Sequence, residues 1–132
     1  MTDKKHDVLL GAAIAALVLI PLGLAMAVLD SRQAGTPPFS ATRDVSVTAT
    51  ACGVPPTARA FVFNATVVPP GFLGFITMWP QGQTQPLAAT LNAYDGAITN
   101  NLAIVPNATG SISVYPSAAT HLVLDIFGYF AP

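Results

Sequence analysis

The chain has 132 residues, of which 52% are apolar and only 8% are charged, and its formal net charge is −1. A typical soluble domain carries about 25% charged residues, so most of this protein's surface must be uncharged. These figures exclude a basic nucleic-acid-binding protein, an acidic tail and a disordered linker. A single cysteine, Cys52, excludes an internal disulfide and a thiolate zinc cluster.

The amino-terminal part of the chain contains a long apolar run. Residues 8–29 include 22 consecutive positions without a charged side chain. A helix of this length would measure roughly 33 Å, enough to cross a bilayer. Lys4 and Lys5 precede the run closely, which favours a cytoplasmic amino terminus. The predicted organisation is a cytoplasmic segment at 1–7, a transmembrane helix at 8–29, a linker at 30–41 and a periplasmic domain at 42–132.

A cleaved signal peptide is the alternative interpretation of this run. The small residues of Ala25-Met26-Ala27 resemble a signal-peptidase site, and the two lysines would form the positively charged region before it. Against cleavage, the apolar run is longer than the usual core of a signal peptide. We therefore expect the segment to be retained.

Small residues recur four positions apart within the predicted helix. This spacing creates smooth ridges where another helix or a pigment can approach closely, although alanine and glycine are also common in membrane helices generally. Pro21 should bend the helix, because it removes one backbone hydrogen bond. His6, at the inner boundary, is expected to be solvated rather than to bind a chlorophyll magnesium. The candidate helix-packing residues are Gly11, Ala15, Gly23 and Ala27.

Beyond the linker, apolar and polar residues alternate with a period of two in short runs bounded by turn residues. This pattern is typical of β-strands with one buried face. Seven such runs at intervals of roughly 10 residues predict an antiparallel β-sandwich of about 100 residues, with an open barrel as the alternative. The runs are 45–51, 59–68, 74–79, 87–93, 101–105, 111–115 and 120–129.

The inventory of reactive side chains argues against an enzyme. His121 and Asp125 fall on the same face of the last strand, but four residues at about 3.3 Å each separate their Cα atoms by roughly 13 Å. No nucleophile elbow, phosphate-binding loop, zinc-protease motif or haem-attachment motif occurs. We therefore predict no catalytic residues, no cofactor of the protein's own and no metal site.

Two further groups of residues have alternative interpretations. Oxygen-bearing side chains near one turn suggest a calcium site, but a turn built from Asn and Asp for backbone reasons explains them better; they are Asn92, Asp95, Asn100 and Asn101. Cys52 is expected to be a small residue that is buried or at a strand edge, with pairing to another chain as the alternative.

Residues 52–130 resemble a β-rich domain found in secreted and surface proteins of Acidobacteria and actinomycetes. The segments that carry the resemblance include Val54-Pro55-Pro56, the strands at 61–67 and 74–80, and the final run at 120–130 with its Thr-His, Asp and Gly-Tyr-Phe residues. The resemblance implies an all-β fold and an extracytoplasmic location. It assigns no catalytic residues.

Together these observations predict a non-catalytic, single-span accessory subunit of a larger bacterial membrane complex, with its β-domain on the periplasmic face of the inner membrane. A photosynthetic reaction centre is the specific hypothesis, by analogy with small peripheral subunits of such assemblies. Its partners would be other transmembrane subunits and a cytochrome, with peripheral contact to pigments or lipids. The alternative is an anchored module that binds cell-wall carbohydrate or a surface protein; its docking candidates are Trp79, Tyr94 and Tyr115.

Overall fold

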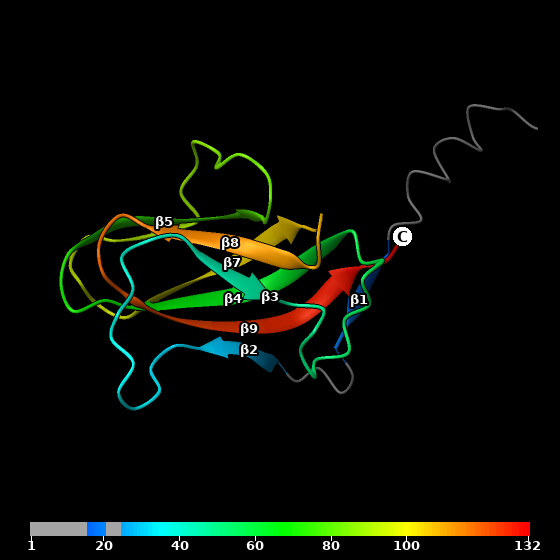
Figure 1. Ribbon diagram of the computed structural model, residues 1–132, viewed down its shortest axis with the longest axis horizontal. Helices are drawn as coiled ribbons and strands as arrows, with labels where there is room; N and C mark the ends of the chain where they lie inside the picture. The colour runs from blue at the N-terminus through cyan, green and yellow to red at the C-terminus, as the bar shows by residue number, and fades with distance from the viewer. Residues whose placement is uncertain (1–15, 21–24) are drawn as a thin grey trace, which may run out of the picture.

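The computed structural model describes residues 16–20 and 25–132 of the chain. These residues form nine β-strands joined by turns and loops, and they contain no helix (Figure 1). The strands are β1 (Leu17–Leu19), β2 (Met26–Asp30), β3 (Arg43–Ser46), β4 (Ala60–Val68), β5 (Leu73–Pro80), β6 (Leu91–Ala93), β7 (Thr99–Pro106), β8 (Ser111–Pro116) and β9 (His121–Phe130).

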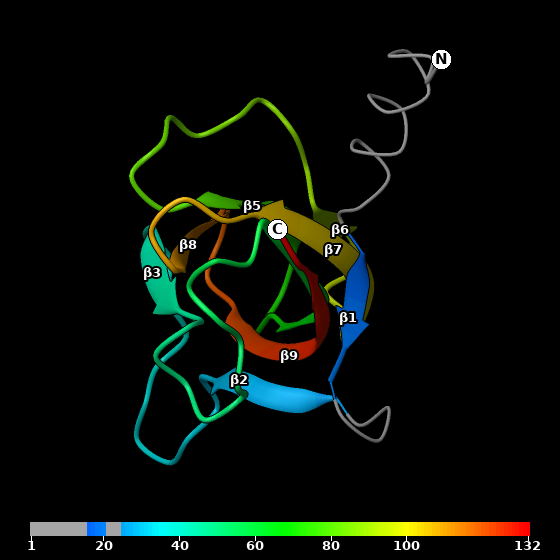
Figure 2. The same ribbon diagram turned by 90° about the vertical axis from the view of Figure 1, so that its right-hand side faces the viewer.

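The strands form two antiparallel sheets that face each other (Figure 2). The large sheet has the order β1-β9-β4-β7. β2 also pairs with β9, nearer the start of that strand than β1 does. The small sheet has the order β3-β8-β5-β6. We call the end of the sandwich where β9 begins the distal end. The opposite end, where β9 finishes beside β1, is the terminal end.

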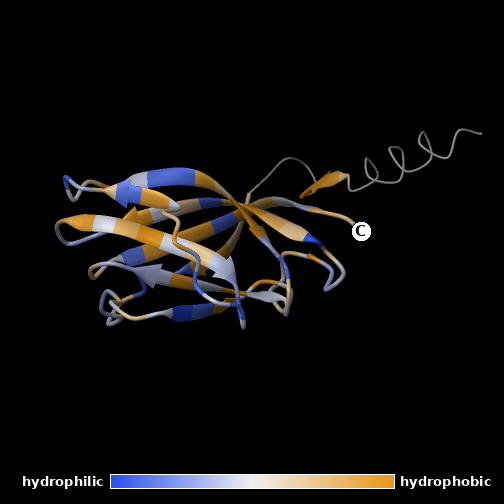
Figure 3. Cartoon of the chain, turned by 90° about the horizontal axis from the view of Figure 1, so that it is seen from above, coloured by the Kyte–Doolittle hydropathy of each residue, from blue (hydrophilic) through white to orange (hydrophobic). Residues whose placement is uncertain are grey.

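Hydrophobic and hydrophilic residues alternate along the strands (Figure 3). Because successive side chains of a strand point to opposite faces, this alternation explains why two layers form. Along β4, Phe61, Phe63, Ala65 and Val67 are fully buried, whereas Asn64 and Thr66 between them are half-buried. In β9, Leu122, Leu124 and Ile126 are likewise fully buried. One face of each sheet is therefore apolar, and burying these faces against each other creates the core.

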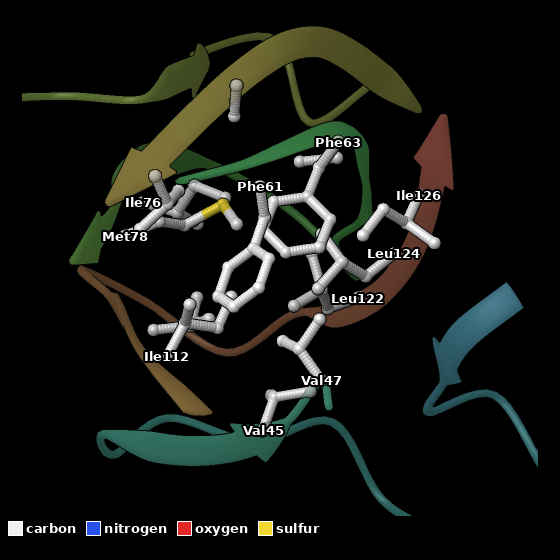
Figure 4. Packing of buried hydrophobic residues seen from close by; sticks show 14 of the residues in the cluster. Val45, Val47, Phe61, Phe63, Ile76, Met78, Ile112, Leu122, Leu124 and Ile126 are labelled. Carbon is white, nitrogen blue, oxygen red and sulfur yellow. The ribbon is translucent and has the colours of Figure 1, made fainter. Parts of the chain in front are cut away.

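The centre of the core lies between β4 and β9 of the large sheet and β5 and β8 of the small sheet. Figure 4 shows Phe61 and Phe63 pointing into this space, with Ile76 and Met78 from β5 on one side and Leu122, Leu124 and Ile126 from β9 on another. The two phenylalanine rings pack at a centroid distance of 5.8 Å. Val45 and Val47 close the core beside β3.

The prediction of an antiparallel sandwich with seven strands beyond the linker is confirmed, since the seven runs correspond in order to β3 through β9. Two runs are shorter than predicted. The first ends at Ser46, because the chain turns where Thr50 donates its backbone N–H and its hydroxyl to the Val47 carbonyl. The fourth covers only Leu91–Ala93, and residues 87–90 belong to a loop.

The prediction of one continuous helix over 8–29 is wrong for the described part of that range, because β1 and β2 are extended strands. Their backbone groups bond to the free edge of β9: Ile20 N–H donates to the Phe127 carbonyl at 2.8 Å, and Ser31 N–H donates to the Leu122 carbonyl at 3.0 Å. Residues 1–15 and 21–24 lie outside the described residues.

Two segments that precede residue 42 pair with strand residues of the sandwich. Met26–Asp30 belongs to the large sheet instead of preceding the β-domain, and Phe39, placed in the linker, bridges to Thr120. Within residues 16–20 and 25–132, no helix has the length and apolar character needed to cross a membrane.

Candidate functional surfaces

His121, the one histidine of the predicted β-domain, stabilises a strand junction. Its Nδ1 lies 2.9 Å from the Ser31 carbonyl oxygen and 3.3 Å from the Ser31 hydroxyl. The same hydroxyl accepts the Leu122 backbone N–H at 2.8 Å, and Ser31 is only 3% exposed. Because these contacts join the end of β2 to the start of β9, His121 attaches the amino-terminal strand to the sandwich. Asp125 is on the same strand and pairs across it with Asn64 and Ala27.

The end of β2 also carries the ion pair between Asp30 and Arg32. The Arg32 guanidinium donates to both carboxylate oxygens of Asp30, at 2.9 and 2.7 Å. The side-chain hydrogen bonds from Arg32, with its backbone N–H as a second donor, lower the pKa of Asp30 from 3.8 to about 2. Both side chains are solvent-exposed, so we expect the pair to be screened by salt and to matter chiefly for local order at this turn.

Replacing Arg32 by alanine should raise the pKa of Asp30 from about 2 toward 3.8, because only the backbone N–H donor would remain. The pKa is lower in the folded protein than in the unfolded chain. The ion pair therefore contributes stability above about pH 4, and this contribution is lost as the pH falls toward 2. An NMR titration of the carboxyl carbon would measure the shift. The variant Arg59→Ala, which removes an exposed arginine at the terminal end, should leave the Asp30 titration unchanged.

Three of the four oxygen-bearing residues considered for calcium bind the backbone. Asn92 donates its amide to the Gly74 carbonyl at 2.7 Å, and Asn101 donates its amide to the Thr90 carbonyl at 2.9 Å. Asp95 accepts the Ala97 N–H at 3.0 Å within its own turn. Among the described residues there is no group of three or more His, Cys, Asp or Glu side chains arranged to hold a metal ion.

The structure places the three aromatic docking candidates in different environments. Trp79 is only 7% exposed, and its indole N–H donates to the Gln83 carbonyl at 3.0 Å, so it fixes the loop that covers it. Tyr115 is half-buried beside Phe75, with ring centroids 6.1 Å apart. Only Tyr94 is largely exposed, at 65%.

Tyr94 forms an aromatic pair that the sequence analysis did not identify. Its ring stacks on that of Phe72 at 5.8 Å, and both side chains are 65% exposed at the distal end. The two rings come from different loops, which are held together where Gly96 approaches Gly71 closely. The pair is therefore a preformed aromatic surface.

The loop between β5 and β6 folds over the outer face of the small sheet. The Thr77 hydroxyl donates to the Ala88 carbonyl at 2.6 Å, and the Met78 N–H donates to the Thr90 hydroxyl at 3.0 Å. Between loop and sheet lies a pocket of about 260 Å³, lined by Phe75, Thr77 and residues 85–89. Leu87 projects from this loop and is completely exposed.

An exposed apolar surface lies on the outer face of the large sheet, and we call it the apolar band. It crosses four strands in register: Val62 on β4 pairs with Ile104 on β7 and with Gly128 on β9, and Gly128 pairs with Leu19 on β1. Leu19, Ile104 and Leu102 are 61%, 56% and 60% exposed. Val62 at its centre is only 9% exposed, and the other members of the band are Leu17, Leu19, Ala60, Leu102, Ile104, Pro106, Phe127 and Phe130.

This outer face is divided into two halves. The residues of the apolar band carry no charge, and its member Leu102 shares a row with Asn64 and Asp125. The distal half beyond that row carries Asp30 and His121 beside Thr66. Soluble monomers rarely expose a contiguous apolar surface of this kind unless it binds something. The arrangement suits contact with an apolar partner at one end and with water at the other.

Of the four candidate helix-packing residues, Gly11, Ala15 and Gly23 lie outside the described residues, and Ala27 is in β2 opposite Asp125. Cys52 is buried, and its thiol lies 3.6 Å from the Ala27 carbonyl. Comparisons of the chain with protein-family models, with curated proteins and with solved structures each found no match.

Proposed function

We propose that this protein is a non-catalytic accessory subunit of a bacterial membrane complex and that it acts by contact through the apolar band. The band itself supports the proposal, because its aliphatic and aromatic side chains cross four strands without a charge. Interface cores are likewise depleted in charged residues.

For the location we propose the periplasmic side of the inner membrane, because residues 52–130 resemble domains of secreted proteins. A photosynthetic reaction centre remains the first assembly to test, with a cytochrome as a neighbouring partner, and this choice rests on analogy.

The test compares two lysine substitutions on the same strand and the same face. Ile104→Lys places a charge in the apolar band, whereas Asn100→Lys places the same charge in the polar half of β7. After mild detergent extraction, the wild type and Asn100→Lys should migrate with a large complex on a native gel. Ile104→Lys should reduce the co-migrating fraction about tenfold, as expected for a residue at the centre of an interface.

Pigment absorbance of the same gel band would test the reaction centre directly. If Ile104→Lys and Asn100→Lys co-migrate equally well, the apolar band is not the contact surface. If the wild type runs as a monomer, the accessory-subunit proposal fails.

A binding module for cell-wall carbohydrate is the second candidate, and the exposed Phe72–Tyr94 pair favours it. Flat, exposed aromatic faces suit the apolar face of a sugar ring. In the experiment above, a monomeric band that is retained on cell-wall polysaccharide, with retention lost in Tyr94→Ala, would select this function.

A further inference from the structure

Among the described strands, β7 is the longest that has a free edge. It has eight residues and pairs with β4 along one side without a register shift. No other described strand pairs with its second side. A free edge of this length is a template on which another extended strand can add.

The other free edges carry features that protect natural sheets against further pairing. β1 and β6 have three residues each, and β3 has four, which include Arg43 and Asp44. β2 contains a register shift and ends at the charged Asp30. β7 has none of these protections, since it is uncharged and its one proline, Pro106, is its last residue.

The direction of the backbone groups shows which part of β7 is free. Successive residues of a strand direct their N–H and C=O groups to opposite edges. The Asn107 N–H, directly after β7, donates to the Arg59 carbonyl at the start of β4 at 2.8 Å, so the odd-numbered residues of β7 face β4. The backbone groups of Asn100, Leu102 and Ile104 therefore point to the free edge.

This edge is complementary to a second copy of itself. A two-fold dimer brings the same strand from both copies together, and the two strands must then be antiparallel. With the two-fold axis at Ala103, Leu102 lies opposite Ile104 of the second copy, and each pair exchanges its backbone hydrogen bonds. Their side chains, which are 60% and 56% exposed, would lie side by side on the outer face. Pro106, which has no N–H, falls opposite Asn100 and ends the pairing.

The absence of charge along β7 also favours a second copy as the occupant. Near a two-fold axis a charged residue lies close to its own copy, and like charges opposite each other destabilise a strand pair. Thr99–Pro106 contains no charged side chain that would oppose this pairing. Two uncharged edges with matching Leu102 and Ile104 therefore meet without repulsion.

We propose that β7 pairs with β7 of a second copy, antiparallel and with the two-fold axis at Ala103, so that the two large sheets form one continuous sheet. This goes beyond the proposed contact role, because it uses the backbone edge of the sheet and leaves the outer face of the apolar band open to another partner. The purified chain, without other subunits, therefore tests it separately from the co-migration experiment.

The first experiment measures the dissociation constant of the dimer by sedimentation of the purified full chain in mild detergent. Leu102→Pro removes an N–H that points to the free edge and leaves the hydrogen bonds to β4, whereas Leu102→Ala keeps that N–H. The wild type should be a dimer. Leu102→Pro should raise the dissociation constant at least about tenfold, because each copy loses a hydrogen bond, and Leu102→Ala should raise it less. A monomeric wild type, or equal effects of the two variants, would overturn the proposal.

The second experiment tests the register without a proline. Leu102→Cys and Ile104→Cys are made as separate variants in a Cys52→Ser background, which removes the only native cysteine. One of the two variants carries an affinity tag. Residues opposite each other in a hydrogen-bonded pair have Cα atoms about 5.5 Å apart, within the range of a disulfide, whereas diagonal positions are about 7–8 Å apart.

Mild oxidation of the mixed variants should therefore give about fivefold more covalent dimer than oxidation of either variant alone. The disulfide in that dimer should join position 102 of one copy to position 104 of the other. Equal yields from the mixture and from the separate variants would contradict pairing about Ala103.

Discussion

Replacing Phe63 by alanine is expected to lower the free energy of unfolding by about 3–5 kcal/mol. The side chain is fully buried between the sheets and packs against Phe61. Its removal loses apolar burial and leaves a cavity, because the surrounding strands are held in register and can relax only partly. Chemical denaturation monitored by the fluorescence of Trp79 would measure the change.

The control for Phe63→Ala is the same substitution at Phe72. This ring is 65% exposed on a distal loop, so its loss should change the free energy of unfolding by less than about 0.5 kcal/mol. A loss below about 1 kcal/mol for Phe63→Ala would contradict the location of the core, since large substitutions at buried sites cost more than that.

The substitution Gly96→Ala should destabilise the protein by about 2–4 kcal/mol through two separate effects. Gly96 has a φ of 73°, which side-chain-bearing residues rarely adopt. An added Cβ would also lie 2.9 Å from the Gly71 carbonyl carbon. Since the obstacle is backbone, the two distal loops would have to separate, and the Phe72–Tyr94 stacking would be lost with them.

The variant Gly35→Ala separates these two effects. Gly35 has a similar φ of 81°, but an added Cβ would meet nothing within 4 Å. Gly35→Ala should therefore lower the free energy of unfolding only by the conformational strain, about 1–2 kcal/mol. Equal losses of unfolding free energy in the two variants would show that the contact between Gly71 and Gly96 contributes nothing.

The strands of the sandwich could be predicted because each has one buried face. In β4, the alternation of phenylalanine, alanine and valine with polar residues directly reflects the two sides of the sheet. The run at 87–93 was predicted too long because Leu87 and its neighbours resemble a strand locally. They form a loop because Thr77 and Thr90 hold them across the outer face of the small sheet.

The amino-terminal strands could not be predicted from hydropathy. An apolar run indicates that the segment leaves water, and it does not say whether lipid or a sheet edge receives it. The decisive partner of β1 and β2 is β9, about 100 residues further along the chain. Trp79 is 7% exposed, and its indole N–H donates to the carbonyl of Gln83, only four residues further along the chain.

The apolar band depends entirely on register. Leu19, Val62 and Ile104 are far apart in the sequence and share a row only because β1, β9, β4 and β7 pair as they do. The Phe72–Tyr94 pair depends in the same way on two loops meeting at the distal end. Tertiary pairing determined both surfaces, so local patterns gave no signal for them.

The antiparallel pairing of β1 with β9 has a mechanical consequence. Leu17 lies opposite Phe130, and the Ala131 N–H donates to the Ala16 carbonyl at 3.0 Å, so both strands leave the sandwich at the same end. Tension applied between Ala16 and Ala131 would load the hydrogen bonds between β1 and β9 one at a time, since antiparallel hydrogen bonds run perpendicular to the strands. These hydrogen bonds would break one after another under low force. β1 would therefore separate from β9 before the pairing between the other strands was broken.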